Sequence, residues 1–338
     1  MTDIATRIDG AAGRITLTRP GALNALTYDM AMAIDRALVD WVEDDAVQLV
    51  ILEAEGEKAF CAGGDVAEIY RRGIAGDHDY ARTFWRDEYR MNARIARFAK
   101  PVVSFLHGFV MGGGVGIGCH GSHRIVCDST RIAMPECAIG LVPDVGGSLL
   151  LSRAPGRLGE FLGLTGHRMD AGDAIHCGFA DSYVPADRWE DLKTALCRGE
   201  TDAIDAAAAP APTSGLAAQD WIDRTFDGTL PEIIAGTTED RAAKALASGS
   251  PLSMACTLEM LRRLRAMEAG IEQALDLEFA FTWRALGQSD FLEGVRAALI
   301  DKDRTPQWRH TPDGVTKTEV EAMLAPLGED ALVWEDRA

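Results

Sequence analysis

The sequence has no uninterrupted apolar stretch of the roughly 20 residues that a membrane-spanning helix needs, so no such helix is predicted. It also has few basic residues: 34 Lys and Arg stand against 52 Asp and Glu, which gives a net charge of −18. A nucleic-acid-binding protein usually carries a basic stripe, and this sequence has none. An anionic ligand would therefore have to be held by local cations and backbone N–H groups, because the overall charge repels it.

Paired cysteine motifs are absent as well. The seven cysteines are an odd number spread along the chain, and no two of them form a Cys-x-x-Cys pair. Neither a disulfide framework nor a zinc site is predicted, and buried free thiols in a reducing compartment are the better interpretation. The first ten residues contain Asp3 and Asp9 and show neither a signal nor a transit pattern, so the cytoplasm is the expected compartment.

The order of apolar segments predicts an α/β fold. Residues 1–200 alternate strands with helices, the helices being expected at Thr27–Asp44 and His78–Ala99. The expected strands are Arg14–Thr18, Val47–Ala54, Val102–His107, Arg124–Cys127 and Arg131–Met134. A loop at Ala206–Ala211 leads into residues 201–338, which we expect to form a mostly helical second region that completes the site and makes subunit contacts. Its helices are predicted at Glu239–Ser248, Pro251–Ala269, Ile271–Leu286 and Asp290–Leu299.

Two glycine clusters follow predicted strands, one at Lys58–Asp65 and one at Met111–Gly118. Glycine brings bare backbone N–H groups close to a ligand without a side chain in the way. If the second cluster opens a helix, its N-terminus adds partial positive charge where an anion or an oxyanion can sit. The second cluster runs into Gly116–Gly121, which matches the Gly-x-Gly-x-x-Gly pattern of dinucleotide sites. In a dinucleotide site this pattern lies at the turn between a strand and a helix, but here it begins inside the expected helix. A nicotinamide site is therefore not predicted.

Glu136 and Asp144 are the only acidic residues in an otherwise apolar stretch, Pro135–Gly147, rich in Pro and Gly. A carboxylate in such surroundings is poorly solvated, so it must be paired, hydrogen-bonded or functional. Two such groups in one loop can act as acid and base, or as nucleophile and base. Capping of a loop remains an alternative role for Glu136.

Four ordered segments resemble the enoyl-CoA hydratase/isomerase (crotonase) superfamily across residues 10–185: Arg19–Met30, Lys58–Val66, Lys100–Gly116 and Ala133–Gly147. The resemblance implies a ClpP/crotonase-like spiral of β-β-α units with a helical C-terminal region. It also implies an acyl-coenzyme A substrate and no separate cofactor, since coenzyme A is part of the substrate. Members of the superfamily commonly form trimers, so a homo-oligomer is a further expectation.

The resemblance assigns roles to residues of both glycine loops. The family's oxyanion hole, made of two backbone N–H groups, corresponds to Gly64 and Gly113. Such donors typically contribute about 3 kcal/mol each toward the transition state. Lys58 and the backbone from Ala62 to Asp65 correspond to residues that hold the coenzyme A portion.

The sequence differs from the hydratase pattern of this superfamily at two positions, and these differences indicate the subfamily. Hydratases use two glutamates, but Gly116 stands where one of them is expected, whereas Glu136 matches the other. Asp144 stands where hydratases have glycine, and the combination is similar to 3-hydroxyisobutyryl-CoA hydrolases. Ser250–Ser253 and Asp290–Trp308 are similar to the same hydrolases, which extends the resemblance to nearly the whole chain.

The implied reaction is hydrolysis of 3-hydroxyisobutyryl-CoA, a step of valine catabolism, with 3-hydroxypropionyl-CoA as a second substrate. Glu136 would attack the thioester carbon or activate water, and Asp144 would position or deprotonate that water. Glu88 matches a position that contacts the acyl end, although a solvated helix charge is its alternative interpretation. Two other functions remain open: a hydratase or isomerase of the same fold, and a catalytically silent acyl-CoA-binding protein.

The histidines, serines and Cys61 near these loops do not lead to a predicted metal site or nucleophile. His107, His120 and His123 lie near the second glycine cluster but have no acidic partner at metal-ligand spacing, so no metal site is expected. No Gly-x-Ser-x-Gly elbow occurs that would support a serine nucleophile. Cys61 has no identifiable base, which favours a packing role.

Overall fold

The computed structural model describes residues 3–334. Contacts divide the chain into two compact units, each assembled from three separate stretches. The first, here called the sheet unit, contains the chain up to Gly64, then Met91–Ala133 and Arg168–Ala218. The second, here called the helical unit, contains Asp65–Arg90, Met134–His167 and the chain from Gln219 onward.

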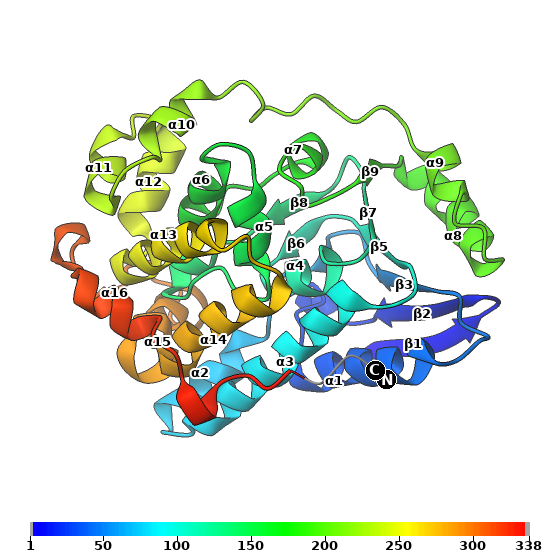
Figure 1. The fold of residues 1–338 in the computed structure, drawn as a ribbon, viewed down its shortest axis with the longest axis horizontal. Helices are drawn as coiled ribbons and strands as arrows, with labels where there is room; N and C mark the ends of the chain where they lie inside the picture. The colour runs from blue at the N-terminus through cyan, green and yellow to red at the C-terminus, as the bar shows by residue number, and fades with distance from the viewer. Residues whose placement is uncertain (1–2, 335–338) are drawn as a thin grey trace. The chain divides into compact units, whose positions relative to one another are not determined.

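A six-stranded sheet forms the centre of the sheet unit (Figure 1). Its strands are, in spatial order, β1 (Ile4–Asp9), β2 (Ala12–Leu17), β3 (Leu49–Ala54), β5 (Val102–Leu106), β7 (His123–Val126) and β9 (Ser182–Tyr183). β1 pairs antiparallel with β2, and every other pairing in this sheet is parallel. The predicted strands here are confirmed, with ends that differ by a few residues, whereas β1 and β9 were not expected.

A second, three-stranded parallel sheet consists of β4 (Ala59–Cys61), β6 (Phe109–Met111) and β8 (Arg131–Ala133). Each of its strands follows a strand of the large sheet in the chain, and a helix then follows. These helices are α2 (Val66–Ile74), α4 (Gly113–Gly118) and the 3-10 turn η2 (Glu136–Ile139). The β-β-α repeat confirms the predicted fold class, although only β8 of the small sheet was expected as a strand.

Helix α1 (Tyr28–Val42) shows how local sequence fixes an element of the sheet unit. The side chain of Thr27 accepts a hydrogen bond from the Met30 N–H at 3.2 Å, which caps the first turn. The predicted apolar face of this helix is buried, including Ile34, Leu38 and Trp41. Helix α3 (His78–Arg97) also matches its predicted range closely.

The large sheet packs against helix α8 (Trp189–Cys197) through one apolar cluster, in which Phe105 and Trp189 meet edge to face at 5.2 Å. Other members are Leu49, Ile51, Val103, Ile125, Leu192 and Leu196. The short helices α7 (Ala171–His176) and α9 (Ala203–Ala207) complete the unit, so the predicted loop Ala206–Ala211 begins inside α9.

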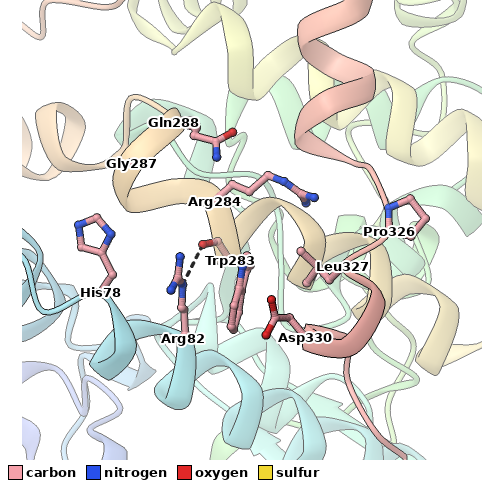
Figure 2. A pocket seen from close by; sticks show the side chains of 9 residues that line it. All are labelled: His78, Arg82, Trp283, Arg284, Gly287, Gln288, Pro326, Leu327 and Asp330. Atoms are coloured by element: carbon pink, nitrogen blue, oxygen red, sulfur yellow. Dashed lines mark hydrogen bonds between the residues drawn. The ribbon is translucent and has the colours of Figure 1, made fainter.

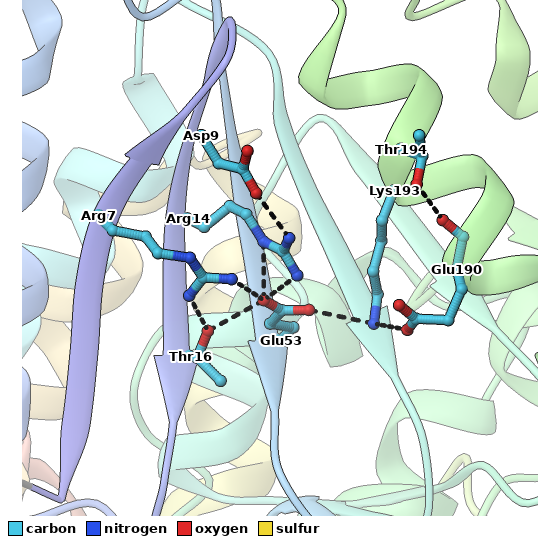
Figure 3. A network of polar contacts seen from close by, with 8 residues as sticks. All are labelled: Arg7, Asp9, Arg14, Thr16, Glu53, Glu190, Lys193 and Thr194. Carbon is cyan, nitrogen blue, oxygen red and sulfur yellow. Dashed lines mark hydrogen bonds and ion pairs between the residues drawn. The ribbon is translucent and has the colours of Figure 1, made fainter.

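An ion network centred on the buried Glu53 also joins α8 to the sheet (Figure 3). Glu53 on β3 accepts hydrogen bonds from Arg14 at 2.7 Å and Thr16 at 2.9 Å, and lies 3.0 Å from Nζ of Lys193 on α8. Lys193 also pairs with the exposed Glu190 at 3.0 Å. Burial opposes ionisation of Glu53, but the charges of Lys193 and Arg14 outweigh it, so the pKa of Glu53 is lowered.

The helical unit contains no strand among its described residues, and the four predicted helices of the C-terminal region are confirmed there. They are α12 (Asp240–Ser248), α13 (Pro251–Ala266), α14 (Ile271–Gln288) and α15 (Phe291–Val295), the last continuing as a π-helical turn over Arg296–Ile300. The remaining helices are α5 (Gly147–Arg153), α6 (Leu158–Thr165), α10 (Asp220–Thr225), α11 (Leu230–Gly236) and α16 (Lys317–Met323). Across residues 3–334, no helix has both the length and the apolar character to cross a bilayer.

Candidate active site

The two glycine loops meet at one edge of the small sheet. β4 and β6 pair in parallel, so the chain leaves both strands on the same side. Gly63 has a φ of 117°, and a Cβ placed on it would lie 3.5 Å from the Met111 carbonyl oxygen. The backbone at Gly63–Gly64 therefore runs directly beside the turn that opens α4.

Gly64 and Gly113 present free N–H groups in these loops. Gly113 is the first residue of α4, a position whose N–H has no partner within a helix, which confirms that the second glycine cluster opens a helix. Within residues 3–334, neither N–H donates to an acceptor of the protein. A Cβ on Gly64 would meet nothing within 4 Å, so packing does not require glycine there.

Gly114 has a different role. A Cβ on this residue would lie 2.2 Å from the Cys61 carbonyl oxygen, so close approach of α4 to β4 demands glycine. Gly116 and Gly118 lie inside α4, which agrees with the prediction that the dinucleotide pattern begins within a helix.

The residues expected to hold coenzyme A lie in and around the first loop. Lys58 is exposed, and its carbonyl accepts a hydrogen bond from the Phe109 N–H at 3.0 Å. The Ala62 N–H donates to the Leu23 carbonyl at 3.0 Å, and Asp65 is the residue that precedes α2.

Four of the carboxyl groups buried in the helical unit interact electrostatically with one another, and we call these four the buried carboxylate cluster. Glu136 begins η2, Asp144 precedes α5, Glu88 lies on α3 and Glu278 lies on α14. Their exposed fractions are between 0% and 5%. In the part of the chain that the structure describes, no lysine or arginine forms an ion pair with any of them. The predicted Glu88, Glu136 and Asp144 thus come together, and Glu88 is not the solvated charge considered as its alternative.

Burial raises the pKa of every member of this cluster, and the charge of Asp144 raises the pKa of the other three further. Burial raises the pKa of Asp144 to about 7, against the hydrogen bonds it accepts, and that of Glu278 to about 8. The pKa values of Glu88 and Glu136 lie well above the ordinary value, first through burial and then through the nearby charge of Asp144. Because these groups affect one another, the titration of the cluster belongs to the group and not to a single residue.

Two buried oxygens of the cluster, Oε1 of Glu88 and Oε2 of Glu136, have no hydrogen-bond partner in the described residues. Buried polar atoms are nearly always satisfied, so an unsatisfied pair in one cluster points to a role beyond folding. By contrast, Asp144 accepts a hydrogen bond from the Tyr89 hydroxyl at 2.8 Å.

Comparison with known proteins decides the family. The profile of the enoyl-CoA hydratase/isomerase family matches residues 12–324. The chain belongs to this family. It is 37% identical to the mitochondrial 3-hydroxyisobutyryl-CoA hydrolase of Danio rerio over 95% of this chain and 88% of that protein.

Two solved structures of this family share the whole fold. A structure described as an enoyl-CoA hydratase from Rhodobacter sphaeroides 2.4.1 is 57% identical with a TM-score of 0.94, over 98% of this chain and all of that one. A structure described as a carnitinyl-CoA dehydratase from Mycobacterium thermoresistibile is 42% identical with a TM-score of 0.94, over the full length of both chains. They confirm the crotonase-type fold that the sequence predicted.

The sequence did not predict three residues that contact or belong to the carboxylate cluster of this enoyl-CoA hydratase/isomerase family member. They are Tyr89, Ser148 and Glu278. Glu278 lies on the buried face of α14 together with Leu275, Phe281 and Thr282. A glutamate at helical spacing within an apolar face is a readable signal.

The histidines and cysteines show no site of their own. His107 packs its ring against Trp189 at 6.2 Å, and burial lowers the pKa of His107. Among the described residues, no three His, Cys, Asp or Glu side chains are arranged to hold a metal ion. All seven cysteines lie in the described part of the chain and are free, and all except Cys197 are buried.

The helical unit also contains a cavity of about 360 Å³, shown in Figure 2, that none of the predicted site residues lines. Its walls include His78, Arg82, Trp283 and Arg284. The Arg82 guanidinium lies 4.2 Å from the centre of the Trp283 ring and donates to the Trp283 carbonyl at 3.3 Å. These contacts hold α3 against α14, the two helices that also carry Tyr89 and Phe279, whose rings meet at 6.0 Å.

Proposed function

We propose that this chain hydrolyses the thioester of 3-hydroxyisobutyryl-CoA, releasing coenzyme A and the free hydroxy acid. The observation that carries the proposal is the buried carboxylate cluster around Glu136 and Asp144, in a chain where Gly116 replaces the second hydratase glutamate. The name of the Danio rerio relative supports the same reaction.

In this proposal the N–H groups of Gly64 and Gly113 bind the thioester oxygen and stabilise the charge that develops there. Backbone donors without a protein acceptor suit this role, because they need no reorganisation when the charge forms. Lys58 and the backbone of Ala62–Asp65 hold the coenzyme A portion.

Glu136 acts on the acyl carbon. As a nucleophile, its carboxylate forms a mixed anhydride and expels coenzyme A as the thiolate, and water then cleaves the anhydride. As a general base, it takes a proton from a water that attacks the carbonyl directly. Asp144 positions or deprotonates the water, and Glu88 contacts the hydroxyl of the acyl group.

Mass spectrometry of the peptide that contains Glu136, after a quenched single turnover, separates these two routes. The nucleophilic route predicts an acyl adduct on Glu136, whereas the general-base route leaves the peptide unmodified.

The acyl pocket should also admit 3-hydroxypropionyl-CoA, because one methyl group discriminates only about tenfold or a little more. In this proposal the enzyme serves valine catabolism, acts in the cytoplasm and assembles from identical subunits. The free thiols fit a reducing compartment.

Hydration of an enoyl-CoA by the same fold is the second candidate, favoured by the description of the Rhodobacter sphaeroides structure. It would have to proceed without a glutamate at position 116, where the helix α4 has glycine. A silent acyl-CoA-binding protein is the third candidate, and it does not explain the unsatisfied oxygens of Glu88 and Glu136.

The test is thiol release from 3-hydroxyisobutyryl-, 3-hydroxypropionyl-, acetyl- and crotonyl-CoA, with loss of the crotonyl double bond followed in parallel. Fast release confined to the 3-hydroxyacyl thioesters supports the hydrolase. Loss of the double bond without thiol release identifies a hydratase, and binding of coenzyme A without turnover identifies the silent protein.

A further inference from the structure

Glu278 is completely buried on α14, and its carboxylate is held by one short segment of the chain. Oε2 accepts a hydrogen bond from the Gly146 N–H at 2.8 Å, and Oε1 accepts one from the Ser148 N–H at 3.1 Å. The Ser148 hydroxyl donates to Oε1 as well. All three donors follow Asp144 by two to four residues.

The segment that Glu278 holds is a tight turn. The Gly147 N–H donates to the Asp144 carbonyl at 2.7 Å, which closes a turn over Asp144–Gly147. Val145 has a φ of 54° inside it, a conformation that a β-branched residue rarely adopts. Such a conformation persists only where the surroundings determine it strongly, and the hydrogen bonds to Glu278 supply that constraint.

A carboxyl group is a costly choice for this purpose. Burying it without a cation is unfavourable, and an apolar residue would fill the space on α14 without that cost. The Gly146 and Ser148 N–H groups, however, would then be buried without acceptors. The buried carboxylate of Glu278 is therefore explained by the turn that it holds, and Asp144 is the first residue of that turn.

We propose that Glu278 is a positioning residue: by anchoring the Gly146 and Ser148 N–H groups, it fixes the turn that aims the Asp144 carboxylate. Tyr89 holds Asp144 from α3, so the carboxylate is constrained through its own oxygen and through its backbone. This inference rests on the proposed function, because it takes Asp144 to be a participant in hydrolysis. Whether Glu278 positions Asp144 can nevertheless be tested without measuring turnover.

The titratable groups that interact electrostatically with Glu278 are Asp144, Glu136 and Tyr89, and Glu88 interacts with Asp144. The charge of Glu278 raises the pKa of Glu136. Removing that charge should therefore let Glu136 ionise at lower pH, an effect that an uncharged packing residue would not produce.

The experiment compares Glu278→Gln, Ser148→Ala and the control Glu272→Gln, the last on the same helix but only partly buried. Gln keeps the size of the side chain but leaves one of the two backbone N–H groups without an acceptor. We expect kcat to fall by about 10- to 100-fold in Glu278→Gln with little change in KM, since misplacing a reacting group by about 1 Å can cost a hundredfold. Ser148→Ala should lose less, because both N–H donors remain, and Glu272→Gln should match the parent protein.

The pH dependence and an activity-independent readout complete the test. The acidic limb of the kcat profile should move to lower pH in Glu278→Gln. In carboxyl ¹³C NMR with labelled aspartate, the Asp144 resonance should shift and titrate differently in Glu278→Gln and stay unchanged in Glu272→Gln.

An unchanged kcat, pH profile and Asp144 resonance in a folded Glu278→Gln protein would overturn the inference and leave Glu278 a packing residue. If the parent protein releases no thiol from any thioester, the proposed function fails, but a changed Asp144 resonance would still establish that Glu278 positions Asp144.

Discussion

The hydroxyl of Tyr89 donates a hydrogen bond to Oδ2 of Asp144 at 2.8 Å, and both groups are buried. This contact favours the ionised form of Asp144 and partly offsets the rise of its pKa through burial. Tyr89 also packs edge to face against Phe279, the residue that follows Glu278 on α14.

Tyr89→Phe should raise the pKa of Asp144 further above its value of about 7, because the phenyl ring keeps the packing but donates no hydrogen bond. A hydrogen bond to a charged group is worth about 1.5 kcal/mol, so the acidic limb of the activity profile should move up by about one pH unit. Activity measured between pH 6 and pH 9 tests this. Recovery of most of the lost activity at the higher pH is expected, and an unmoved profile would exclude Asp144 from the titration.

Glu136→Gln should lower thioester hydrolysis by several orders of magnitude, because the amide can neither attack the acyl carbon nor accept the proton of water. The fold should survive, since the side chain keeps its size. The matched control is Glu57→Gln, an exposed position before β4, which should hydrolyse at the parent rate. Near-normal activity of Glu136→Gln would remove this residue from the mechanism.

The buried cluster should make the protein less stable as the pH rises from about 4 to about 8. The pKa of Asp144 rises from 3.8 to about 7 on folding and that of Glu278 from 4.5 to about 8, so the folded state binds more protons in this range. The contribution of both groups is therefore complete below pH 4 and is lost as the pH passes their folded values. Urea unfolding across this range should show a fall in the free energy of unfolding as the pH rises, and this fall should be smaller in Asp144→Asn. A free energy of unfolding equally pH-dependent in both proteins would contradict the assignment.

Gly64→Ala and Gly114→Ala should separate a site glycine from a packing glycine. The added Cβ in Gly64→Ala would meet no atom within 4 Å, so this variant should fold normally, but the methyl group enters the space assigned to the thioester. We expect kcat/KM to fall by roughly 10- to 100-fold, as expected for a displaced substrate. In Gly114→Ala the Cβ would lie 2.2 Å from a backbone oxygen, so its melting temperature should drop or it should not fold. Equal stability of the two variants would contradict this distinction.

Glu53→Gln should cost about 3 kcal/mol of stability, because it leaves the Lys193 and Arg14 charges without their shared buried partner. Glu190→Gln is the matched control. It touches the same Lys193, but its side chain is 85% exposed, and we expect a change within about 0.5 kcal/mol. Chemical denaturation gives the free energy of unfolding of both variants. Similar losses of stability would show that burial does not determine how much these ion pairs stabilise the protein.

The sequence predicted those parts of the site whose signal is local. Glycines clustered at strand ends indicated exposed N–H groups, and Gly64 and Gly113 have them. Two acids in an apolar stretch indicated buried functional groups, and Glu136 and Asp144 are buried. Their catalytic roles remain predictions.

What the sequence did not predict depends on contacts between distant segments. β4 and β6 have three residues each, too few for any periodicity, and they exist because they pair with one another. Glu278 reaches the Asp144 turn across 132 residues of sequence, and no local pattern connects α14 to that turn. Tyr89 lies in an amphipathic helix, where an aromatic residue is ordinarily only packing.

Neither unit is a continuous piece of chain, since the polypeptide passes from one to the other at five boundaries. During synthesis, the segment Met134–His167 emerges long before Glu278, so the Asp144 turn has no carboxylate to hold it until most of the protein has been made. Contacts of such long range are slow to form. A chain truncated near residue 200 would keep Asp144 but lose α14, and with it the group that accepts the Gly146 and Ser148 N–H bonds.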